Sequence, residues 1–169
     1  MKLEPEQEAW IINFIQKELR FMPSIDRDDP FLPFSINRPF AVYDISQMTQ
    51  EQIHLLHELA PQALQNCLKP GYMIYAIDWH HNAILYDPLR PEEARCSHPS
   101  YLSYTKSGLG YYECFYPDGD YYFYLDRFGA FGYLSHPWRE EVWIYGSSLL
   151  AEFEKIAPEL GWILKASVK

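Results

Sequence analysis

The sequence predicts a single α+β domain over residues 1–169, with a mainly antiparallel meander sheet of about six strands in its second half. The periodicity of apolar residues changes from about 3.6 to about 2 after the turn signal Lys69-Pro70-Gly71. Helical patterns lie mainly toward the two ends of the chain, and 169 residues with 48% hydrophobic content suffice for one core. We therefore expect the N-terminal and C-terminal helices to pack on one face of the sheet, with the other face partly exposed.

Three segments have the pattern of amphipathic helices. Residues 5–20 place Trp10, Ile11, Phe14, Ile15 and Leu19 at helical spacing. A second helix starts at a capping box of Thr49 and Gln52 and is expected to kink or restart at Pro61. A third follows Gly146-Ser147-Ser148 and has four apolar residues on one face: Leu149, Leu150, Phe153 and Ile156.

The remaining pattern favours short strands and loops. Four prolines in residues 21–40 predict an extended segment. Residues 89–111 have little pattern and are expected to form an inserted loop that is either mobile or in contact with a partner. The turn at residues 116–120 contains Pro117 and Gly119, which predicts a bulged hairpin. Strands are expected at 40–45, 72–79, 83–87, 112–116, 120–126, 129–135 and 141–145, with an edge strand near 161–168.

Charge and composition exclude several functional classes. A net charge of −9 disfavours binding to nucleic acid or anionic lipid and favours a cationic partner. Cys67, Cys96 and Cys114 have no CxxC spacing, which predicts free thiols in a reducing compartment. No apolar run is long enough for a signal peptide or a membrane span, so we expect a soluble cytoplasmic protein. No cofactor-binding motif is present, and no cofactor is expected.

The stretch DWHHNAILYDP contains a candidate catalytic or metal site. If His81-Asn82 is a two-residue hairpin loop, Asp78 pairs with Leu85, and Asp78, His80 and Asp87 share one face. Alternate strand residues lie about 6.5 to 7 Å apart, so these groups could bind one metal ion or act as an acid/base set. The alternative, which we favour, is that they make hydrogen bonds that hold the hairpin. The opposite, core face would take Met73, Tyr75, Ile77, Trp79, Ile84 and Tyr86.

Two further groups are candidates. His136, in Ser135-His136-Pro137-Trp138, could be a general base, or it could belong to a structural loop in which Trp138 packs against a helix.

Residues 111–126 contain no Lys or Arg, and alternation places Tyr122 and Tyr124 on one side. With Asp118, Asp120 and Trp138 they predict an acidic, aromatic surface for a cationic protein. The alternative is a sheet buried on both faces.

Several short motifs follow one another along the chain: Tyr43-Asp44-Ile45-Ser46, Lys69-Pro70-Gly71, Tyr75-Ala76-Ile77-Asp78-Trp79-His80-His81, Asp87-Pro88, Pro117-Asp118-Gly119-Asp120-Tyr121-Tyr122 and Ser135-His136-Pro137-Trp138. Their order and spacing resemble the bacterial family called domain of unknown function 2716, over residues 40 to about 157. Ser135 stands where the family pattern has glycine, and the 89–111 insert is longer than is typical. The resemblance implies no activity.

These observations favour a binding function over catalysis, because the common enzyme signatures are missing. The expected function is an acidic protein-binding domain, in its concrete form an immunity-type protein that neutralises a basic toxin domain, by analogy with other small acidic proteins. The alternative is a metal-dependent or acid/base enzyme acting on a small molecule through Asp78, His80 and Asp87, joined by His136. A third possibility is a structural subunit of a larger assembly. The sequence predicts no particular oligomeric state.

Overall fold

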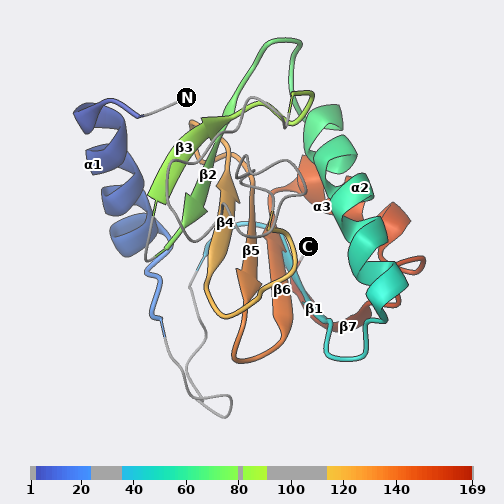
Figure 1. Cartoon of the computed structure of the whole chain (residues 1–169). Helices are drawn as coiled ribbons and strands as arrows, with labels where there is room; N and C mark the ends of the chain where they lie inside the picture. Colours follow the sequence, from blue (N-terminus) through green and yellow to red (C-terminus); the bar gives the residue numbers. More distant parts are fainter. Residues whose placement is uncertain (1–2, 24–35, 80–81, 91–113, 169) are drawn as a thin grey trace.

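The chain folds around one seven-stranded sheet in which every neighbouring pair is antiparallel, in the order β3-β2-β4-β5-β6-β1-β7. The computed structural model describes residues 3–23, 36–79, 82–90 and 114–168 (Figure 1). The predicted α+β class is confirmed. The strands are β1 (Phe40–Asp44), β2 (Ile74–Asp78), β3 (Asn82–Tyr86), β4 (Tyr122–Leu125), β5 (Gly132–His136), β6 (Glu141–Tyr145) and β7 (Ile163–Val168).

The described helices are α1 (Pro5–Asn13), continued by a π-helical turn η1 (Phe14–Glu18), α2 (Gln50–Asn66) and α3 (Ser147–Ile156). The capping box of α2 is confirmed, because the Gln52 N–H donates to Thr49 Oγ1 at 3.3 Å and the Thr49 N–H donates to Gln52 Oε1 at 2.9 Å. α2 continues through Pro61 and does not restart there.

Both faces of the sheet are covered, which corrects the expectation that all helices share one face. Leu64 of α2 and Phe153 of α3 belong to one core, whereas Ile11 of α1 and Ile15 of η1 belong to a second core. Figure 1 shows α1 on one side of the sheet and α2 with α3 on the other. Consecutive strand residues are apolar, so each side of the sheet needs its own cover.

The hairpin predicted between residues 112–116 and 120–126 is wrong. β4 pairs with β2 on one side and with β5 on the other, which leaves no free edge for a further strand. The described part of the first segment, residues 114–116, forms no strand. Gly119 does have the positive φ that the turn pattern required, +123°.

The register predicted for the β2–β3 hairpin is also wrong. Asp78 pairs with Asn82 rather than with Leu85, a shift of three residues. An odd shift reverses the faces of one strand relative to the other. Ile84 and Tyr86 therefore lie on the same face as Ile74 and Ala76, against α2 and α3. Because both faces of this hairpin are apolar, the hydrophobic pattern could not determine the register.

Several further predictions concern the rest of the chain. Cys67 and Cys114 are free thiols, as predicted, and Cys96 lies outside the described residues. Most of the expected 89–111 loop also lies outside them. In the described part of the chain, no helix has the length and apolar character that would be needed to cross a bilayer.

Candidate functional site

Buried polar side chains gather at one end of the sheet, in its last two cross-strand rows. The first row, facing α2 and α3, runs through Asp78, Tyr122 and Ser135. The second row, facing α1, runs through Trp79, Tyr121, His136, Glu141 and Asp44. Of the six buried polar or charged residues in the described chain, all but Asp126 lie in or beside these rows: Asp78, Asp120, Ser135, His136 and Glu141.

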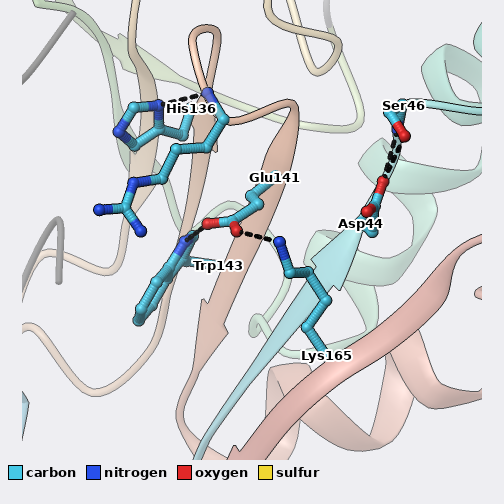
Figure 2. Close-up of polar contacts among 7 residues, drawn as sticks. Asp44, Ser46, His136, Glu141, Trp143 and Lys165 are labelled. Carbon is cyan, nitrogen blue, oxygen red and sulfur yellow. Dashed lines mark hydrogen bonds and ion pairs between the residues drawn. The ribbon is translucent and has the colours of Figure 1, made fainter. Parts of the chain in front are cut away.

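Glu141 has a hydrogen-bond donor for each oxygen of its carboxylate. Its side chain is buried on β6, where Oε2 accepts from Trp143 Nε1 at 3.0 Å and Oε1 accepts from Lys165 Nζ at 2.6 Å (Figure 2). Lys165 reaches it from β7 across β1, from the position where the β1–β7 register shifts. Both oxygens of this buried carboxylate therefore accept a hydrogen bond, one of them from a cation.

His136 is the last residue of β5 and is fully buried. Its Nδ1 accepts a hydrogen bond from the backbone N–H of Arg139 at 3.3 Å (Figure 2). Its ring lies edge-on to the Tyr121 ring, with 4.7 Å between the ring centroids. An accepting Nδ1 places the proton of the neutral ring on Nε2. The imidazole therefore holds the turn of residues 137–140 against the sheet.

Within the described residues, Ser135 and His136 do not form a nucleophile–base pair. Ser135 and His136 are adjacent in β5, so their side chains lie on opposite faces of the sheet. Cys114 Sγ donates to the Tyr116 carbonyl at 2.8 Å. Burial, with the charge of Asp118, raises the pKa of the Cys114 thiol, so it is a protonated, poor nucleophile at neutral pH.

The described members of the proposed metal or acid/base site, Asp78, Asp87 and His136, do not converge. Asp78 ends β2 opposite Asn82, whereas Asp87 follows β3 at the other end of the hairpin. Asp87 instead accepts from the Leu89 N–H at 3.0 Å. His136 lies on the opposite face from Asp78, and His80 is outside the described residues. Among the residues the structure describes, no three His, Cys, Asp or Glu side chains are placed to hold a metal.

The tyrosines expected on a partner-binding surface are buried instead. Tyr122 and Tyr124 belong to the core under α2 and α3, as in the alternative of a sheet buried on both faces. Tyr122 Oη donates to Asp118 Oδ1 at 2.5 Å, and Tyr124 Oη accepts from the Cys114 N–H at 3.1 Å. Burial raises the pKa of Tyr122, assisted by the nearby Cys114 and Asp118. These hydrogen bonds allow the phenols to enter the core.

Two of the other predicted partner residues, Trp138 and Asp118, are accessible. Trp138 is 40% exposed, so it does not bury against a helix, and Asp118 is also exposed, whereas Asp120 is buried.

The 137–140 turn ends at Glu140, which has a φ of +51°, an uncommon conformation for a residue other than glycine. The 116–120 segment leads into β4, whose first residue pairs with Ser135 just before the 137–140 turn, so the segment and the turn lie at the same end of the sheet. Burial and the charge of Glu140 raise the pKa of Tyr116. We call Asp118, Trp138 and Glu140 the sheet-end surface.

Sequence reasoning missed Glu141, Trp143 and Lys165. A signal was present, because Glu141 is the single charge in the strand EVWIY and Lys165 is the single charge in ILKASV. An isolated charge in an apolar strand needs a partner if it is buried. The strand pairing that joins them is set by tertiary structure, because 24 residues separate the two positions.

Comparison with known proteins gives a family but no activity. The chain is 26% identical over 132 residues to the uncharacterized protein YxiI of Bacillus subtilis (strain 168), and the match covers 72% of this chain and 74% of that protein. No solved structure matches significantly. The model of a family described as "protein of unknown function (DUF2716)" matches residues 2–150, which extends the resemblance well ahead of residue 40. The chain therefore belongs to the DUF2716 family.

Proposed function

We propose that this chain is a cytoplasmic protein-binding domain that recognises a basic protein, and that its concrete role is that of an immunity-type protein covering the active site of a basic toxin domain. The observation that carries the proposal is the sheet-end surface. An exposed tryptophan, Trp138, stands there with the acidic residues Asp118 and Glu140, in a chain whose net charge is −9.

The chemistry of this surface suits a protein partner. Tryptophan is enriched among residues that dominate binding energy, because it contributes a large rigid contact area. Acidic residues around it would attract a basic partner and raise the association rate at low salt. The turn that carries Trp138 is held by the buried His136, so little conformational entropy would be lost on binding.

The test begins with capture of the partner in the bacterium that carries the gene, using the tagged chain and mass spectrometry. The partner, purified separately, is then titrated against the wild-type chain and the variant Trp138→Ala. We expect the variant to bind at least about 30-fold more weakly, the loss that corresponds to a hot-spot residue. Asp118→Asn and Glu140→Gln should slow association and reduce its dependence on salt.

The matched control is Phe128→Ala. Phe128 is 78% exposed and lies in the turn between β4 and β5, at the opposite end of the sheet, so its removal should leave affinity unchanged. A captured partner that is acidic, or one that binds Trp138→Ala as tightly as the wild type, would refute the proposal. So would the absence of any specific partner.

A further inference from the structure

A groove runs between α3 and the strands β1 and β7, away from the sheet-end surface. Two adjoining cavities of about 250 and 490 Å³ form it, and they share Ala41, Glu154 and Ser167. Leu150 and Ala151 line one cavity, and Pro158, Trp162 and Leu164 line the other. The walls are therefore mainly apolar, with one charged group at the junction of the two cavities.

That charged group, Glu154, has no counter-ion among the described residues. The neighbouring acid on α3, Glu152, binds Lys155 at 2.5 Å and Asn66 at 2.8 Å. Within the described part of the chain, no Lys or Arg lies within ion-pair distance of Glu154. Burial and the charge of Glu154 together raise the pKa of Tyr43, which lines the same groove. The groove thus presents a carboxylate between two apolar cavities.

The dimensions of the groove suit a short extended peptide. From Ser147 to Ile156, α3 is about 15 Å long at 1.5 Å per residue, which matches about five residues of extended chain. In an extended segment, residues i, i+2 and i+4 point to the same side and lie about 7 Å apart. Apolar side chains at the two ends would enter the two cavities while the middle side chain meets Glu154.

We propose that the α3–β7 groove binds an extended segment of a partner protein, in which one Lys or Arg lies between two apolar residues at alternate positions. The cation complements Glu154, which has no ion pair in the described part of the chain, and the apolar side chains fill the two cavities. This binding site does not require the sheet-end surface, so the two proposals can fail separately.

The probe is a displayed library of random peptides, selected on the whole chain. We expect the enriched sequences to share an apolar residue, a Lys or Arg two positions later and a second apolar residue two positions after that. A synthetic peptide of this sequence is then compared with its Lys→Gln analogue by fluorescence polarisation. The lysine peptide should bind the wild-type chain about fivefold more tightly, and Glu154→Gln should abolish this preference.

One further variant, with its controls, locates the site. Ala151→Trp should fill one cavity and reduce binding of either peptide at least about tenfold. The matched controls Ala9→Trp on α1 and Glu58→Gln on α2, both at exposed positions, should change nothing. Trp138→Ala should also leave peptide affinity unchanged. Selection without such a motif, or a lysine preference that survives in Glu154→Gln, would overturn the proposal.

Discussion

At the scale of single residues, Glu141 shows how this sheet accommodates a buried charge. Its side chain is almost inaccessible, yet both carboxylate oxygens have donors, from Trp143 and Lys165. The Lys165 side chain remains 45% exposed, so the cation loses only part of its hydration. The arrangement links β6 to β7 across the intervening β1.

Replacing Lys165 by Met should therefore destabilise the fold at neutral pH. The variant leaves Glu141 buried with a single neutral donor, and we expect a loss of about 1 to 3 kcal/mol in the free energy of unfolding. Urea denaturation followed by tryptophan fluorescence measures it. The double variant Glu141→Gln with Lys165→Met should recover part of the loss, because no charge then remains unpaired.

Lys155→Met is the matched control for this change. Lys155 pairs with Glu152 on the exposed side of α3, and exposed pairs contribute at most about 0.5 kcal/mol. If both lysine variants lost the same stability, the Lys165 pair would have no special structural role.

At the scale of elements, the junction of β6 and α3 depends on Gly146. This residue has a φ of +89°, caps α3 without a side chain, and donates its N–H to the Pro39 carbonyl at 2.9 Å. A Cβ at this position would lie 2.5 Å from the Ala130 carbonyl oxygen and 2.8 Å from the Phe131 Cα. Both backbone conformation and space therefore require glycine here.

We expect Gly146→Ala to cost at least about 2 kcal/mol, because backbone atoms must move in addition to the strain of a positive φ. Gly71→Ala is the comparison, since Gly71 has a φ of +76° but nothing within 4 Å of the added Cβ. That variant should cost about 1 kcal/mol. Chemical denaturation of the two variants separates the cost of a positive φ from the cost of the close backbone contacts. Equal losses of stability would show that the contacts at Gly146 relax without cost.

Helices that are marked by a few consecutive residues could be predicted from the sequence. Strands that are defined by pairing with distant strands were predicted less well. The capping box at Thr49 and the apolar spacing of α3 are properties of a few consecutive residues, and both helices form where predicted. The register of the β2–β3 hairpin and the absence of a strand at 114–116 depend on which strands lie beside β2 and β4. Long-range competition for strand edges is not encoded in a local pattern.

At the scale of the whole molecule, one sheet carries two cores. In β5, Tyr133 belongs to the core under α2 and α3, and the adjacent Leu134 belongs to the core under α1. Because consecutive residues of the same strands build both cores, loss of one should remove the support of the other. We therefore expect the described part of the chain to unfold as one cooperative unit.

Leu64→Ala and Leu134→Ala test this coupling, one in each core. Each should reduce the free energy of unfolding by about 2 to 5 kcal/mol through loss of buried area and creation of a cavity. For both variants, far-UV circular dichroism and tryptophan fluorescence should give the same midpoint. Midpoints that separate in either variant would show that the two cores unfold independently.

The sequence by itself determined the α+β class, the capping box of α2, the apolar faces of α2 and α3, the free thiols Cys67 and Cys114, and the net negative charge. Each follows from local periodicity or composition. Only the tertiary structure decided that α1 covers the second face, that Tyr122 and Tyr124 are buried, and that Asp78, His136 and Asp87 lie apart. The physical reason is that both faces of the strands are apolar, so alternation could not distinguish core from surface, and the pairing of distant strands made the choice.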